Sequence, residues 1–182
     1  MQKVQIKYKV FNKNLCENFL TIVNKKLILN YLFDEALNFV NHNKTIKIHN
    51  NFLDPSSKTQ IFKIKELKTI EFTITLVNLQ TIQEINKSYR NKDYPTNVIS
   101  FEEPILQNKK DIYIGDIYIN PEVIKQEAIK ENIVINNHYI HIMLHGFLHL
   151  LGFDHIKDKD AKIMEGIEIK TLEQFYIQNP YN

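Results

Sequence analysis

The sequence has very little cysteine and no long apolar run. Cys16 is the only cysteine among 182 residues, so no disulfide can form within the chain and a reducing compartment is expected. No stretch approaches the roughly 20 apolar residues of a membrane-spanning helix. The N-terminal residues alternate in polarity instead of forming the apolar core of a secretory signal. These features predict a cytoplasmic protein with no membrane partner.

A strong excess of charge of one sign is also missing. Lysine and arginine total 23, and aspartate and glutamate total 21, which gives a formal net charge of +2. Proteins that hold nucleic acid mainly by charge are far more basic, so composition alone neither indicates nor excludes RNA binding. With 182 residues, 43% of them hydrophobic, the chain has the size of one folded domain. We therefore expect a single domain over residues 1–182.

Histidine is concentrated in one stretch. Five of the seven histidines lie in residues 138–155, HYIHIMLHGFLHLLGFDH. His145 and His149 are four residues apart, so on an α-helix they lie on the same face. Gly152 follows where a left-handed cap would end the helix and turn the chain back, and His155 lies on the return. Three neutral imidazoles at about 2.0 to 2.1 Å hold Zn²⁺ and leave its fourth position open. The spacing predicts one zinc per chain, bound by His145, His149 and His155.

This ligand spacing matches that of the metzincin proteases, H-E-x-x-H-x-x-G-x-x-H. Gly146 stands where those proteases carry the glutamate that acts as general base in peptide hydrolysis. A zinc metalloprotease therefore remains an alternative that Gly146 argues against. A binding protein with a structural metal is a second alternative, but structural zinc sites are usually closed by four protein ligands rich in cysteine. Packed core histidines are a third, disfavoured because His155 lies at the ligand distance beyond a glycine.

Three polar residues beside the predicted ligands have weaker signals. His138 and His141 continue the helical stripe toward the N-terminus, and we expect them to support the ligands or to pack as ordinary side chains. Asp154 precedes the last ligand. It could orient an imidazole or accept a proton, or it could be a turn residue that bonds its own backbone.

Apolar periodicity predicts an α+β fold, with a small mixed β-sheet of about four strands covered by helices, one of them a zincin-like metal-binding helix. The expected strands cover residues 3–10, 70–76, 98–101 and 112–119. Lysines alternate with apolar residues in the first strand, which is typical of a sheet edge. The polar segment after residue 41 is expected to form a hairpin extension or an ordered loop.

The helices are expected between these strands and after them. They cover residues 15–40 as one bent helix or two, 81–90, 121–130, the metal helix, and a last helix marked by Met164, Ile167, Leu172 and Phe175. Thr81 and Glu84 read as a capping box for the second of these regions, with Tyr89 on its buried face. Asn120 is the expected cap of the next helix. Asn136 or Asn137 is the expected cap of the metal helix.

HGFLHLLGFDH resembles the H-G-x-L-H-L-x-G-[FY]-D-H signature of the YbeY family, metal-dependent endoribonucleases that act in bacterial ribosomal RNA maturation. Two further stretches agree. SYRNKDYPTNVISFE, residues 88–102, is similar to the family segment Y-R-x-K-D-x-P-T-[DN]-V-L-S-F, with Ile99 where leucine is usual, and IGDIYI, residues 114–119, resembles its L-G-D-I-x-I strand. The resemblance covers the chain from about residue 72 onward, after an opening longer than the family's.

The resemblance implies a single-strand-specific, metal-dependent endoribonuclease. It implies a role in late-stage 70S ribosome quality control and in maturation of the 16S rRNA 3′ end, with 16S rRNA and the small ribosomal subunit as partners. In the family, the arginine of the Y-R segment lies in the cleft beside the metal, and Arg90 matches that position. We therefore expect Arg90 and His145 to be catalytic and Arg90 to bind substrate, because a guanidinium can bind two phosphate oxygens at once. The alternative is an arginine favoured at a helix C-terminus by the helix dipole.

Overall fold

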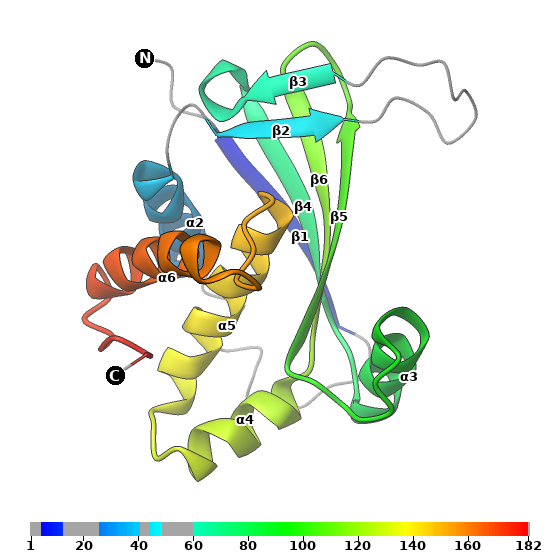
Figure 1. Cartoon of the computed structure of the whole chain (residues 1–182), viewed down its shortest axis with the longest axis vertical. Helices are drawn as coiled ribbons and strands as arrows, with labels where there is room; N and C mark the ends of the chain where they lie inside the picture. The colour runs from blue at the N-terminus through cyan, green and yellow to red at the C-terminus, as the bar shows by residue number, and fades with distance from the viewer. Residues whose placement is uncertain (1–4, 13–25, 41–43, 49–59, 182) are drawn as a thin grey trace.

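The computed structural model describes residues 5–12, 26–40, 44–48 and 60–181. Its central sheet has four strands in the order β1-β4-β6-β5 (Figure 1), which confirms the predicted number and the mixed character of the sheet. The strands are β1 (Gln5–Asn12), β4 (Thr69–Leu76), β5 (Val98–Leu106) and β6 (Asp111–Ile119). β4 pairs in parallel with β1 and β6, while β5 is antiparallel to β6. As the lysine pattern predicted, β1 is an edge strand, and Lys7 pairs with Glu71 across it at 3.3 Å.

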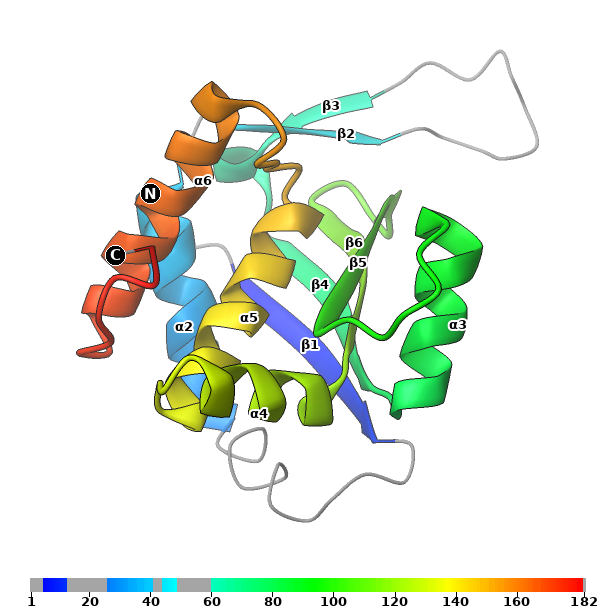
Figure 2. The same cartoon turned by 60° about the horizontal axis from the view of Figure 1, so that its bottom comes forward.

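A two-stranded antiparallel sheet projects beyond one end of the central sheet (Figures 1 and 2). It consists of β2 (Thr45–Ile48) and β3 (Gln60–Lys63), with Ile46 opposite Phe62. A short 3₁₀ turn, η1 (Ile64–Glu66), leads from β3 into β4. This arrangement confirms the hairpin extension, whose connection lies outside the described residues.

The helices cover both faces of the sheet. They are α2 (Lys26–Phe39), α3 (Leu79–Arg90), α4 (Pro121–Lys130), α5 (Ile135–Leu150) and α6 (Asp158–Glu173). Figures 1 and 2 show α5 on one side of the sheet, with α2 and α6 beyond it, and α3 on the other side. The helix expected over residues 15–40 is seen from residue 26 onward, and its earlier part lies outside the described residues. No helix of the described chain is both long enough and apolar enough to span a membrane.

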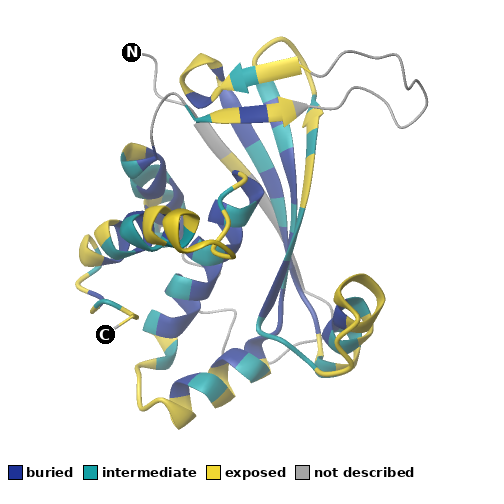
Figure 3. Cartoon of the chain, viewed as in Figure 1, coloured by how far each residue is buried: buried dark blue, intermediate teal, exposed yellow. Residues whose placement is uncertain are grey.

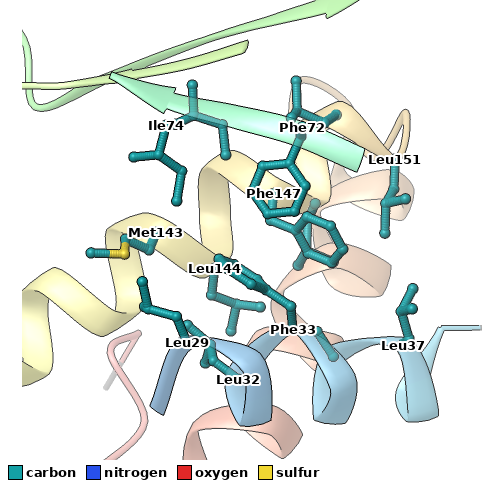
Figure 4. Close-up of a cluster of buried hydrophobic side chains, with 14 of the residues drawn as sticks. Leu29, Leu32, Phe33, Leu37, Phe72, Ile74, Met143, Leu144, Phe147 and Leu151 are labelled. Atoms are coloured by element: carbon teal, nitrogen blue, oxygen red, sulfur yellow. The ribbon is translucent and has the colours of Figure 1, made fainter. Parts of the chain in front are cut away.

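The main core lies between the sheet and α5. Burial is concentrated along α5 and the central strands (Figure 3). Phe33 of α2, Phe72 of β4 and Phe147 of α5 meet there (Figure 4), with ring centroids 4.9 to 5.2 Å apart. Such aromatic contacts add to the burial of apolar area that stabilises the fold. The sheet thereby fixes the position of α5, the helix that carries the histidines.

The edge strand β5 places side chains on both faces of the sheet, because successive side chains along a strand point to opposite faces. The Ser100 hydroxyl donates a hydrogen bond to the Gly146 carbonyl of α5 at 3.0 Å. Ile99 instead packs with Val77 and Ile82 in a smaller cluster under α3. α3 and α5 are therefore separated by the β5 edge.

The helix α3 begins earlier than the sequence predicted. Its cap is Asn78, whose side chain accepts a hydrogen bond from the Thr81 amide at 2.8 Å, so the expected Thr81–Glu84 capping box is wrong. Glu84 accepts from Gln80 at 3.0 Å instead. The sequence predicts a buried Tyr89, but the residue is 69% exposed because it lies at the end of the helix; its ring lies 4.7 Å from that of Phe101, between centroids.

Two other boundaries differ from the prediction, and one is confirmed. α5 starts at Ile135 after an extended Val134, so neither Asn136 nor Asn137 is its cap. The sequence predicts that β5 ends at residue 101, but the strand continues to Leu106. The register shifts between Glu102 and Ile105, and such a bulge lets a strand stay paired with its neighbour across an irregular stretch. The Asn120 cap of α4 is confirmed by its acceptance of the Val123 amide at 2.8 Å.

Candidate metal centre

The helix α5 is buried on nearly every side except along a stripe of histidines. Its buried positions include ten residues from His138 to Leu150. His141, His145 and His149 are only partly buried, at intervals of four residues. A helix that is apolar elsewhere packs against the sheet and its neighbours, so this stripe is the part of α5 left open for chemistry. Two of the predicted ligands, His145 and His149, lie on that stripe.

The end of α5 returns the chain to the same stripe. Gly152 has a φ of +72°, the left-handed conformation that the sequence predicted. The Gly152 amide donates to the His149 carbonyl at 2.8 Å, and the Phe153 amide donates to the Leu148 carbonyl at 3.1 Å. These bonds close the helix with a left-handed cap and reverse the chain. The ring of His155 consequently lies 5.1 Å, between centroids, from the rings of both His145 and His149.

The three predicted ligands converge on one point. His145, His149 and His155 each offer a nitrogen within 4.8 Å of the others. The Nε2 atoms of His145 and His149 are 3.1 Å apart. Two nitrogens that bind one tetrahedral zinc at 2.0–2.1 Å lie roughly 3.3 Å apart, so the observed separation fits a shared ion.

Hydrogen bonds at the Nδ1 atoms of His145 and His149 determine which ring nitrogen carries the proton. The Nδ1 of His145 donates to Glu168 Oε1 at 2.9 Å, and the Nδ1 of His149 donates to the Phe153 carbonyl at 3.0 Å. Carboxylate and carbonyl oxygens only accept, so both Nδ1 atoms carry the proton and both Nε2 atoms present a lone pair. Burial, together with His145 and His155, lowers the pKa of His149 to about 4, which keeps its imidazole neutral near pH 7. Facing lone pairs of this kind are stabilised by a cation between them.

Gly146 lies against the sheet rather than beside the ligands. A Cβ there would lie 3.0 Å from Ile117 Cγ2, 3.2 Å from Ser100 Oγ and 3.3 Å from Val98 Cγ2. The absence of a side chain therefore lets α5 approach β5 and β6 closely. A glutamate at this position would meet the sheet, so the geometry gives the protease alternative a second argument against it.

Alanine substitutions at two helical glycines test this packing role. Gly146→Ala is expected to lower the free energy of unfolding by about 1 kcal/mol, because overpacking of about 1–3 kcal/mol exceeds the helix-propensity gain of about 1 kcal/mol. The matched control is Gly166→Ala in α6, where no atom lies within 4 Å of the added Cβ, and it should stabilise by about 0.5–1 kcal/mol. Urea denaturation of the zinc-free proteins measures both changes in the free energy of unfolding. A Gly146→Ala protein as stable as Gly166→Ala would contradict this role.

The remaining residues singled out from the sequence lie around the histidine group. His138 bonds Glu127 of α4 through Nε2 at 2.8 Å and belongs to a network with Asn97. His141 faces Glu168 of α6, with 3.8 Å between its Nε2 and Glu168 Oε2. Asp154 accepts from the His155 amide at 2.7 Å, in keeping with the turn interpretation. None of the three is part of the His145–His149–His155 group within the described residues.

Arg90 lies on α3, whereas the three histidines lie on α5 and in the segment after it. It is the exposed last residue of α3, followed by Asn91 with a φ of 57°. Figure 2 shows α3 and α5 on opposite sides of the sheet, with β5 between them. No hydrogen bond or ion pair joins Arg90 to the three histidines in the described ranges. Its predicted role in catalysis and substrate binding stays a prediction.

Sequence reasoning missed Glu168 and Tyr181. Glu168 lies in α6 with an exposed fraction of 0%, and the Tyr181 hydroxyl donates a hydrogen bond to its Oε2. Burial would raise the pKa of this carboxyl, but hydrogen bonds from His141, His145 and Tyr181 lower it to about 2. The available signal was a glutamate within the apolar stripe of Met164, Ile167 and Leu172, where a charged side chain needs a partner.

Comparison with known proteins identifies the family. A family model described as endoribonuclease YbeY matches residues 38–176. A relative named endoribonuclease YbeY from Francisella tularensis subsp. holarctica is 48% identical over 115 residues, covering 61% of this chain and 71% of its own. One of the same name from Colwellia psychrerythraea is 49% identical over 111 residues, covering 61% and 72%. A solution structure of a Thermotoga maritima protein, 17% identical, has a similar fold, with a TM-score of 0.50 over 93% of this chain and 92% of that one. The chain therefore belongs to the YbeY family of endoribonucleases.

Proposed function

We propose that this protein hydrolyses phosphodiester bonds in single-stranded RNA at one zinc ion bound by His145, His149 and His155. The observation that carries the proposal is the convergence of three imidazole nitrogens within 4.8 Å, in a chain whose family model is described as an endoribonuclease. Three protein ligands leave a fourth coordination position for water or substrate, which is the catalytic form of a zinc site.

The residues of the centre have two roles: the histidines would hold the zinc, and Glu168 and the Phe153 carbonyl orient two of them. The chemistry that zinc supplies in such sites is Lewis acidity and a pKa of about 7 for coordinated water. His145 and His149 present Nε2 lone pairs, because Glu168 and the Phe153 carbonyl hold their Nδ1 protons. As a ligand beside the open position, His145 belongs to the catalytic machinery. The partly buried stripe of α5 leaves one side of the group accessible to a substrate.

Arg90 is proposed to bind the RNA backbone. Phosphodiester cleavage builds negative charge on the non-bridging oxygens, and a guanidinium can bind two of these oxygens at once. Arg90 is exposed at the end of α3, and Figure 2 shows the β5 edge between α3 and α5. An RNA strand that contacts both has to pass round that edge, which a flexible single strand does more easily than a duplex.

The biological substrate is proposed from the family resemblance. It implies late-stage 70S ribosome quality control and maturation of the 16S rRNA 3′ end, in the cytoplasm, with the small ribosomal subunit as partner. The relatives named above carry the endoribonuclease name. The protease alternative is less well supported, because the position of the missing glutamate faces the sheet at Gly146.

A substrate panel tests this function. Zinc-loaded protein should cut a single-stranded RNA oligonucleotide, cut the same sequence slowly when it is paired in a duplex, and leave casein intact with Zn²⁺, Mn²⁺ or Co²⁺. Chelation should abolish RNA cleavage and added zinc should restore it, because the hydrolytic centre depends on the ion. Casein cleavage by a preparation that leaves RNA intact would overturn the proposal in favour of the protease.

A further inference from the structure

A buried carboxylate lies directly behind one of the proposed ligands. Glu168 of α6 has an exposed fraction of 0%. Its Oε1 accepts from His145 Nδ1 at 2.9 Å, and its Oε2 accepts from the Tyr181 hydroxyl and lies 3.8 Å from His141 Nε2. Removing a carboxylate from water is costly unless hydrogen bonds compensate, so this set of partners is needed to hold it there.

We propose that Glu168 is a positioning residue of the zinc centre and that Tyr181 holds it in place. The inference rests on the proposed function and extends it to two residues from the C-terminal part of the chain. By accepting the Nδ1 proton, Glu168 fixes the tautomer and the ring orientation of His145, so that Nε2 points toward His149 and His155. An acceptor of this kind also makes the imidazole a more basic ligand.

The two ligands on α5 are oriented by different parts of the fold. The Phe153 carbonyl, in the turn directly after α5, holds His149. The partner of His145 comes from another helix, 23 residues further along the chain. Tyr181 then brings the C-terminal segment to the same point, with its ring 5.8 Å from that of His141. The docking of α6 and the chain end therefore sets the geometry of the first ligand.

Glu168 could instead bind a metal itself, since His141, His145 and Glu168 also place ligand atoms within 4.8 Å of one another. The geometry favours positioning, because Glu168 is fully buried and Tyr181 already occupies its second oxygen. A metal bound through Glu168 would have to displace the hydrogen bond from His145 or the one from Tyr181. A second zinc per chain that disappears in Glu168→Gln would overturn the positioning role.

A second carboxylate–histidine pair, between Glu127 of α4 and His138 of α5, provides a matched control. Glu127 bonds His138 at 2.8 Å, a separation close to that of Glu168 and His145. His138 is not in the three-histidine group. Glu127→Gln therefore perturbs a pair of the same kind, whose histidine also lies on α5, without touching a proposed ligand. Any effect that comes only from weakening a structural contact of α5 should appear in this variant too.

The experiment measures zinc affinity rather than activity. The zinc dissociation constants of wild type, Glu168→Gln, Tyr181→Phe and Glu127→Gln are obtained by competition with a chromophoric chelator. Glu168→Gln should weaken binding about 10- to 100-fold, the usual effect of removing a ligand's outer partner. Tyr181→Phe should weaken it less, because the carboxylate stays while losing one hydrogen bond, and Glu127→Gln should stay within about twofold. The visible spectrum of the cobalt-loaded protein should differ from that of wild type in Glu168→Gln and Tyr181→Phe, and should be unchanged in Glu127→Gln.

Two results would overturn the inference while leaving the zinc centre intact. One is a Glu168→Gln protein that is folded and binds zinc as tightly as wild type. The other is an equal loss of affinity in Glu168→Gln and Glu127→Gln. If Glu168→Gln does not fold, unchanged affinity in Tyr181→Phe contradicts the inference by itself, because Tyr181 is 43% exposed and its substitution is mild. Failure of wild type to bind zinc would overturn the proposed function and this inference together, whereas zinc-loaded protein without ribonuclease activity would contradict only the function.

Discussion

Replacing Arg90 with alanine is expected to reduce RNA cleavage about 10²- to 10³-fold, the usual cost of removing one charge-stabilising donor. Zinc content and thermal stability should stay close to wild type, because the side chain is exposed at the end of α3 and is not one of the proposed ligands. Arg90→Lys should recover only part of the rate, since an ammonium cannot reproduce the bidentate geometry of a guanidinium. Single-turnover cleavage of a short RNA at matched zinc occupancy measures all three proteins.

The control for Arg90 is another cation on the same helix. Lys87 is exposed and already paired with Asp93 at 2.7 Å, so Lys87→Ala should change the rate little. Equal rates in wild type, Arg90→Ala and Arg90→Lys would show that Arg90 is merely a helix-end residue. Varying the RNA concentration then locates the contact. A lower kcat assigns Arg90 to the reacting phosphate, and a higher KM with unchanged kcat assigns it to a neighbouring one.

The three proposed ligands could be predicted from the sequence because their geometry is local. His145 and His149 share a helix face, and Gly152 supplies the single turn that returns His155 to it. The helical period and one residue with positive φ are enough to bring the three histidines together, and both can be predicted from the residue types. The same holds for the Asn120–Pro121 start of α4 and for the lysines of the edge strand β1.

The supporting residues could not be predicted because their contacts are distant in sequence. Glu168 and His145 are 23 residues apart in the sequence, and the packing of α6 on α5 brings them into contact. The role of Gly146 against Ile117 likewise depends on how α5 lies on the sheet. The sequence showed only that glutamate was missing there, and the structure adds the steric reason. Strand order depends on pairings such as β1 with β4, which span more than 60 residues.

Helix starts were predicted less well for a local reason. Asn78, Thr81 and Glu84 all have side chains that can cap, and the sequence offers several starts of similar quality. The apolar contacts of Ile82 with Val77 and Ile99 select the start at Leu79. At α5 an extended Val134 precedes the helix without any side-chain cap, so no polar residue marks its beginning.

Zinc content in the His149→Ala protein tests the central claim most directly. His149 can offer the ion only its Nε2, because its Nδ1 bonds the Phe153 carbonyl. The variant should lose nearly all bound zinc and all RNA cleavage, since two imidazoles alone hold the ion poorly. The matched control is His138→Gln on the same helix, whose side chain bonds Glu127 instead. It should keep one zinc per chain and near wild-type cleavage. One tightly bound zinc per chain in His149→Ala, measured by elemental analysis after gel filtration, would contradict the three-histidine centre.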